Sequence, residues 1–195
     1  FCLGARSPKP TTGSLLKAAE MALHESCRNA PSAIRAYSRE MGETTVKRAT
    51  LVKDACSALE NGQIAAWFQP QISTDTGLVT GFEALARWQH PKRGTVAPAE
   101  FLPALEESGQ LRRLSEVILF DALTALQIWD RSGVFVPCVS VNLTAEELRN
   151  PKLAETIRWD LNRFDLAPER LNIEVLETDV AGSPEDVATR NLVAL

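Results

Sequence analysis

From residue 65 onward, short apolar runs with strand-like alternation are separated by longer stretches with helical spacing of the apolar residues. The strand-like runs are residues 65–72, 79–88, 138–143 and 171–177. Helical spacing is found in residues 98–108, 111–133 and 145–164. Strands that alternate with helices predict βα units and a largely parallel sheet.

The residues before this region show a different pattern. Residues 1–5, 13–29 and 32–37 predict a strand, a helix and a second strand, a piece too small to bury a core by itself. Residues 43–62 predict an amphipathic helix that ends at Asn61 and Gly62. We therefore expect a connector helix that leads into a second domain.

Alternation within the predicted strands places polar side chains on one face. In the third strand the apolar residues share one face, and Ser140 and Asn142 share the other. Glu83 and Arg87 lie on one face of the second strand, and Glu174 occupies the corresponding face of the fourth. Three successive strands thus each direct an oxygen-bearing side chain inward, near the end that leads into the next loop.

Barrels of the (β/α) type carry their chemistry at this end of the strands. Two carboxylates and one amide, from Glu83, Glu174 and Asn142, suit Mg²⁺ or Mn²⁺ better than Zn²⁺. Arg87 would then contact a phosphate oxygen. Taken singly, Glu83 with Arg87 also fits a structural ion pair, and Asn142 fits a hydrogen bond at a strand end. The residues alone thus support a Mg²⁺-dependent α/β-barrel enzyme acting on a phosphorylated small molecule.

Composition excludes several classes of protein. The 195 residues are 45 % hydrophobic and 24 % charged, an ordinary globular balance. The net charge of −4 argues against DNA or RNA as a partner, because backbone binding requires a basic face. No apolar run approaches the roughly 18 residues that span a bilayer. The four cysteines form no C-x-x-C pair, so we expect a reducing cytoplasm, with any membrane tether upstream of the chain.

The segment FQPQISTDTGLVTGFEALARWQHPKRGTVAPAEFLPALEESGQL, residues 68–111, resembles the opening of the EAL domain family, bacterial phosphodiesterases for cyclic di-GMP. The matching residues are Gln69-Pro70, Glu83-Ala84-Leu85, Arg87-Trp88, Pro91, Pro98, Phe101 and Glu106, followed by Asn142-Leu143-Thr144, Glu174 and Glu177.

The resemblance implies an eight-stranded barrel whose first strand is antiparallel, with one or two Mg²⁺ or Mn²⁺ ions at the strand ends. Glu83, Asn142 and Glu174 match the family's metal ligands, and Glu83 is also the expected catalytic residue. Arg87 matches a phosphate-contacting arginine and Gln69 a glutamine of the substrate site. The implied reaction is hydrolysis of cyclic di-GMP to linear pGpG by a metal-activated water that attacks in line.

The expected fold class is therefore α/β, an incomplete TIM-like barrel of the EAL type. Residues 1–41 resemble the α+β C-terminal part of a GGDEF-like domain, 42–62 the connector helix, and 63–195 the N-terminal half of an EAL domain. In the family an Asp-Asp motif, a lysine and further glutamates follow the segment matched here, and none of them is in this sequence.

The partners that the resemblance implies are cyclic di-GMP, a second copy of the chain through the EAL domain, and an upstream sensory or GGDEF domain. The alternative function is an inactive EAL-like receptor, or a module for regulation or dimerisation.

Overall fold

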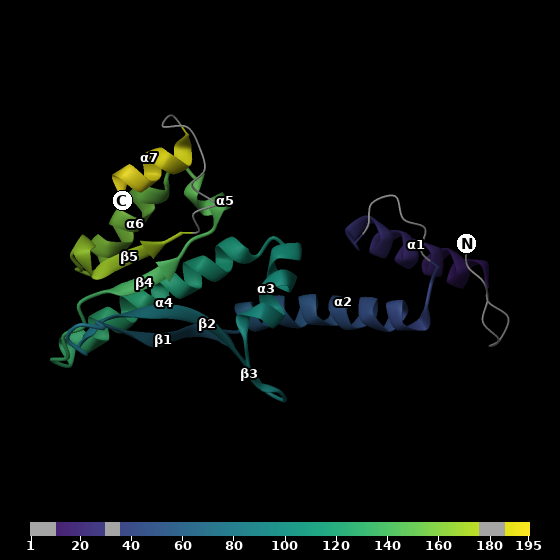
Figure 1. Ribbon diagram of the computed structural model, residues 1–195, viewed down its shortest axis with the longest axis horizontal. Coiled ribbons are helices and arrows are strands. Elements are labelled where there is room, and N and C mark those ends of the chain that lie inside the picture. Colours follow the sequence, from purple (N-terminus) through teal and green to yellow (C-terminus); the bar gives the residue numbers. More distant parts are fainter. Residues whose placement is uncertain (1–10, 30–35, 176–185) are drawn as a thin grey trace. The chain divides into compact units, whose positions relative to one another are not determined.

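The computed structural model describes residues 11–29, 36–175 and 186–195, which Figure 1 shows in colour. The chain divides into two compact units, residues 1–55 and 56–195. None of the helices in the described ranges combines the length and the apolar composition needed to cross a bilayer.

Two helices form the described part of the N-terminal region. Helix α1 (Thr12–Asn29) confirms the first predicted helix, and α2 (Arg39–Glu60) confirms the helix predicted over residues 43–62. Helix α2 begins earlier than expected and crosses the boundary between the units, and its role as a connector between domains stays a prediction. Gly62 ends α2 with a positive φ of 68°, which glycine adopts without strain. The first predicted strand lies outside the described residues. Of the second, Ala36 and Tyr37 are described and lie in neither a helix nor a strand.

The second unit is built on a mixed sheet. Its strands are β1 (Ile64–Ile72), β2 (Val79–His90), β3 (Gly94–Val96), β4 (Val139–Asn142) and β5 (Leu171–Glu174). The order is β1-β2-β4-β5, and β3 pairs with β2. β1 pairs antiparallel with β2, whereas β2, β4 and β5 are parallel. The α/β class and the antiparallel first strand are therefore confirmed, and the topology is that of part of a barrel.

The connections between these strands are helical. They are α3 (Pro98–Glu107), α4 (Leu111–Arg131), α5 (Ala145–Leu148), α6 (Leu153–Arg163) and the short 3₁₀ helix η1 (Pro168–Arg170), and α7 (Val187–Ala194) follows β5. The single helix predicted over residues 145–164 was wrong, because Pro151, which lacks an amide hydrogen, follows the end of α5. Strand β3 and helix α7 were not predicted.

Helix α4 covers the apolar face of the sheet (Figure 1). Trp129 lies against Phe68 of β1 and Phe82 of β2, with ring centroids 5.1 and 5.4 Å apart. Asp121, a charged residue of α4, accepts a hydrogen bond of 2.9 Å from the amide of Ala66. It thereby satisfies a backbone donor of β1 and fixes α4 on the sheet.

The start of β5 is held to the end of α4 by a charged pair. Arg170 donates two hydrogen bonds of 2.9 and 2.8 Å to the carboxylate of Asp130 and one of 3.2 Å to the carbonyl of Val136. Such bidentate contacts have defined geometry as well as strength. The strands that carry the polar face are therefore supported from behind by α4.

Candidate functional site

The polar residues predicted to face inward occupy matching positions on neighbouring strands. Gln69 of β1 is opposite Glu83 of β2, and Glu83 is beside Ser140 of β4. Two residues further along β4, Asn142 is beside Glu174 of β5. Residues paired in this way lie on the same side of a sheet. The polar face predicted from alternation therefore spans four strands.

Glu83 and Asn142 are in direct contact. The amide Nδ2 of Asn142 donates a hydrogen bond of 2.9 Å to Oε1 of Glu83. Asn142 is the last residue of β4, and its exposed side chain lies at the strand end where the next loop begins. The fold thus brings together two residues that are 59 positions apart in the sequence.

Glu174 is linked to the same region by its backbone and by its carboxylate. Its carbonyl accepts a hydrogen bond of 2.9 Å from the amide of Leu143, which extends the β4–β5 pairing beyond Asn142. Its Oε1 accepts a hydrogen bond of 3.3 Å from Nε2 of Gln71, and the same nitrogen lies 3.4 Å from Oγ of Ser140.

The sequence prediction did not include Gln71 or Ser140 among the site residues. The alternation could have identified both residues, because Gln71 follows Gln69 by two positions and Ser140 precedes Asn142 by two, which places each pair on one face of its strand.

Arg87 does not form the ion pair with Glu83 that the sequence left as an alternative. Its Nη1 donates a hydrogen bond of 2.8 Å to the carbonyl of Ala86, and among the described residues no carboxylate pairs with its guanidinium. The side chain is half-buried. Gln69 is exposed, and the described residues provide no hydrogen bond to its side chain. Both residues keep donors that a phosphodiester ligand would engage.

The donor chemistry of Glu83, Asn142 and Glu174 fits a hard divalent cation. All three offer side-chain oxygens, the ligand type that Mg²⁺ and Mn²⁺ prefer. An asparagine amide can turn to present its oxygen where it now donates from nitrogen. No cluster of three or more His, Cys, Asp or Glu side chains suited to a metal occurs in the part of the chain that the structure describes. An ion here would therefore depend on the amide of Asn142 as well as on carboxylates.

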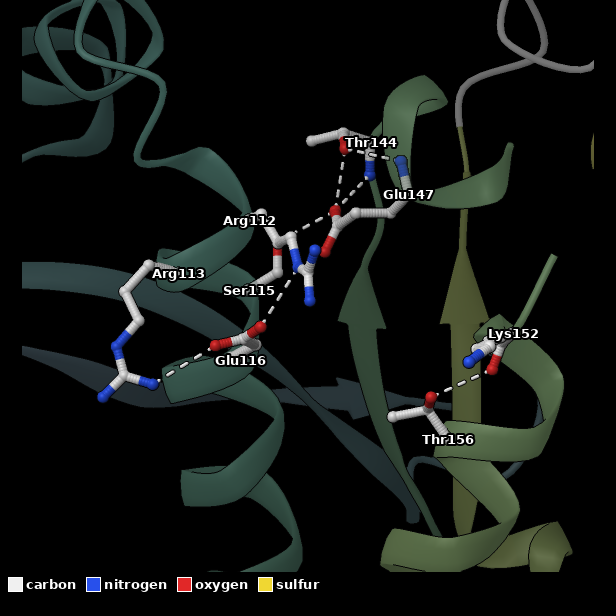
Figure 2. A network of polar contacts seen from close by, with 8 residues as sticks. All are labelled: Arg112, Arg113, Ser115, Glu116, Thr144, Glu147, Lys152 and Thr156. Carbon is white, nitrogen blue, oxygen red and sulfur yellow. Dashed lines mark hydrogen bonds and ion pairs between the residues drawn. The ribbon is translucent and has the colours of Figure 1, made fainter. Parts of the chain in front are cut away.

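The loop that follows Asn142 is fixed by a compact hydrogen-bond network (Figure 2). Thr144 caps α5, and Glu147 completes a capping box because its Oε2 accepts from the amide of Thr144 at 2.9 Å and from its hydroxyl at 2.8 Å. The same oxygen accepts from the hydroxyl of Ser115 in α4 at 3.0 Å. Glu147 thus ties the segment after Asn142 to a long helix.

A cavity of about 430 Å³ lies between α4, α5 and α6, behind β4 and β5. Val141 and Ile173, on the opposite face from Asn142 and Glu174, line it. Burial raises the pKa of Asp160, which lines this cavity, and Glu116 adds to the rise while Arg163 opposes it. This cavity is separated from the polar face by the sheet itself.

Comparison with known proteins places these features in context. The EAL domain family matches residues 52–195. MucR of Pseudomonas aeruginosa, a bifunctional diguanylate cyclase/cyclic di-GMP phosphodiesterase, is 31 % identical over 142 residues, which cover 73 % of this chain and 21 % of MucR. RocR of the same organism, a cyclic di-GMP phosphodiesterase, is 31 % identical over 144 residues, which cover 74 % of this chain and 36 % of RocR.

The fold also matches a solved structure of the PaMucR phosphodiesterase in complex with c-di-GMP. The two chains are 32 % identical with a TM-score of 0.66, over 75 % of this chain and 57 % of the other. This chain spans 19–20 % of the length of the first three curated relatives it matches.

Proposed function

Since the chain belongs to the EAL domain family, we propose that it hydrolyses cyclic di-GMP to linear pGpG in bacterial second-messenger signalling. The observation that carries this proposal is the contact of 2.9 Å between Asn142 and Glu83 at the strand ends, with Glu174 in register beside Asn142. The similarity to MucR and RocR, which are both described as cyclic di-GMP phosphodiesterases, supports the choice of substrate.

Glu83, Asn142 and Glu174 would hold a Mg²⁺ or Mn²⁺ ion through their side-chain oxygens. When bound, such an ion supplies the Lewis acidity that makes water a nucleophile near neutral pH. Glu83 occupies the central position, because it is opposite Gln69 and in contact with Asn142. It is therefore the residue on which we place catalysis.

The other side chains of this face would bind and orient the nucleotide. Arg87 lies four residues after Glu83 on the same strand and would donate to a non-bridging phosphate oxygen. Gln69, exposed and opposite Glu83, would hydrogen-bond the substrate next to the reacting phosphate. Hydrolysis then forms one bond between phosphorus and the water oxygen and breaks the bond to the 3′ oxygen, which leaves as a hydroxyl after taking up a proton.

The setting of this domain is also a proposal. We place it in the cytoplasm, as a homodimer formed through the EAL domain and downstream of a sensory or GGDEF domain. The resemblance of residues 1–41 to the end of a GGDEF-like domain, and the bifunctional nature of MucR, support this arrangement.

The test is hydrolysis of cyclic di-GMP by the protein in the presence of Mn²⁺ or Mg²⁺, with chromatography to detect pGpG. Glu83→Gln removes the charge while it keeps the shape of the side chain. Glu116→Gln is the matched control, because Glu116 is exposed on α4, where it pairs with Arg112 and Arg113 at 3.2 Å. We expect pGpG from the parent and the control and none from Glu83→Gln.

Two results would contradict this proposal. Binding of cyclic di-GMP without pGpG would show the alternative function, a receptor or regulatory module. Absence of both binding and product would remove the nucleotide from the function of this chain.

A further inference from the structure

The side chain of Gln71 crosses from β1 to two other strands. Its Nε2 lies 3.3 Å from Oε1 of Glu174 on β5 and 3.4 Å from Oγ of Ser140 on β4. Ser140 is only 2 % exposed, so its hydroxyl needs a partner within the protein. Gln71 therefore contacts a proposed metal ligand and a buried polar group with one nitrogen.

The backbone around Gln71 is shaped by an irregularity in the pairing of β1 with β2. Gln71 is opposite Gly81 and Ile72 is opposite Val79, which leaves Thr80 as the extra residue. The hydroxyl of Thr80 donates a hydrogen bond of 3.2 Å to the carbonyl of Gln71. Bulges of this kind redirect a side chain and often occur beside active sites.

Gly81 provides the space that this arrangement needs. A Cβ atom at Gly81 would lie 2.8 Å from both the carbonyl oxygen and the sulfur of Cys138, and 3.4 Å from Oε1 of Gln71. A side chain at position 81 would therefore clash with Cys138, the residue before β4, and its Cβ would reach van der Waals contact with the Gln71 amide. A glycine opposite Gln71 therefore allows the close approach of Cys138 to β2.

We propose that Gln71 is a positioning residue that holds the carboxylate of Glu174 for the divalent cation, with Ser140 as the second contact of its amide. This inference rests on the proposed function. A neutral amide suits the task, because it fixes one carboxylate oxygen without cancelling the charge that a cation requires. The other oxygen of Glu174 remains for the ion, and partners that orient a ligating carboxylate commonly strengthen metal binding.

The alternative interpretation is a hydrogen bond that only stabilises the sheet. A structural role would change the stability of the protein and leave its metal affinity unchanged, so both quantities must be measured on the same variants. Gln71→Met keeps an unbranched side chain of similar size and removes both amide donors. Gln89→Met is the matched control, since Gln89 lies on β2 and its Nε2 bonds the hydroxyl of Thr95 at 3.1 Å.

The experiment is a titration of the full chain with Mn²⁺ alone, followed by the electron paramagnetic resonance signal of the free ion, with thermal unfolding measured without metal. We expect Gln71→Met to raise the Kd for Mn²⁺ by about 10- to 100-fold, and Gln89→Met to leave it within about two-fold. Ser140→Ala, a smaller change in case Gln71→Met does not fold, is expected to raise the Kd by a few-fold at unchanged stability.

Equal Mn²⁺ affinity of the parent and of the folded Gln71 and Ser140 variants would overturn the inference and leave the proposed function standing. If the parent binds no Mn²⁺, or binds it with an affinity that Glu83→Gln does not change, the proposed metal site is removed and the inference with it.

Discussion

Replacement of Glu147 by alanine tests how firmly the loop after Asn142 is anchored. The substitution removes one carboxylate oxygen that accepts three hydrogen bonds of 2.8 to 3.0 Å, from the amide and hydroxyl of Thr144 and from the hydroxyl of Ser115. The capping bond of 3.3 Å that the backbone amide of residue 147 donates to the Thr144 hydroxyl does not involve the side chain at position 147 and can persist. Figure 2 shows that the bond from Ser115 is the one that reaches from α4 to α5, whereas the two bonds from Thr144 lie within the cap of α5.

The expected loss can be estimated from these contacts. Hydrogen bonds to a charged group contribute about 1.5–3 kcal/mol each when buried. Glu147 is half-buried, so water replaces part of that contribution for the groups left behind. Loss of a helix cap usually costs about 0.5–2 kcal/mol. The higher helix propensity of alanine offsets only a few tenths of a kcal/mol of this loss. We therefore expect Glu147→Ala to lower the free energy of unfolding by about 2 kcal/mol.

The measurement is urea unfolding near neutral pH, followed by circular dichroism and fitted to a two-state transition. Glu146→Ala is the matched control, because Glu146 lies in the same short helix with its side chain exposed. The control should change the free energy of unfolding by less than about 0.5 kcal/mol. Ser115→Ala should cost about 1 kcal/mol, and less than that when Glu147 is already alanine, since the two side chains share one hydrogen bond.

Equal unfolding free energies for Glu147→Ala and Glu146→Ala would refute this reasoning. A changed urea dependence in the Glu147 variant would point to a different unfolded or native state and would also contradict a simple loss of contacts.

Three further substitutions test the packing and the charges of the second unit. Asp160→Asn should stabilise the protein near neutral pH, because burial raises the pKa of Asp160 and so makes its charged form unfavourable in the folded state. This gain in the free energy of unfolding, measured by urea unfolding across pH, should vanish as the pH falls below about 3.9, the pKa of the carboxyl in the unfolded chain. Asp130→Asn should instead destabilise the protein near neutral pH, because hydrogen bonds from Arg170 lower the pKa of Asp130 and favour its charged form in the folded state. The stability that Asp130 contributes is present above a pH of about 3.9 and is lost in acid, so an equal loss of unfolding free energy at every pH would contradict this. Trp129→Ala should lower the free energy of unfolding by about 3 kcal/mol through lost packing on the sheet, whereas Trp159→Ala, at a residue 62 % exposed, should lower it by less than about 1 kcal/mol. Similar losses for the two variants in urea unfolding would show that Trp129 is not part of the core.

The strands were predicted from the sequence because burial imposes a two-residue period. β1, β2 and β4 begin and end within two residues of the predicted runs. The short strand β3 has only three residues, so no period could identify it. Its position depends on the turn at Gly94, where a positive φ of 71° turns the chain back on β2. The pairing with β2 is what makes these residues a strand.

The candidate site was predicted in part for the same reason. Alternation places Glu83, Asn142 and Glu174 on one face, and the contact between Asn142 and Glu83 follows from it. The contact of Gln71 with Glu174 joins residues 103 positions apart and crosses two intervening strands. It depends on the stagger of the strands and on the irregular pairing after Gln71, which a single strand's pattern does not encode.

The two faces of β4 and β5 link the site to the packing behind it. Asn142 and Glu174 face the polar side, and the residues just before them, Val141 and Ile173, face the cavity behind the sheet. The amide of Leu143 joins the two strand ends by its bond to the carbonyl of Glu174. A change in packing behind Val141 would therefore shift the strand ends that carry Asn142 and Glu174 together, because successive side chains on a strand share one backbone. The precision of the cation site proposed on this face would thus depend on apolar residues that lie outside the site.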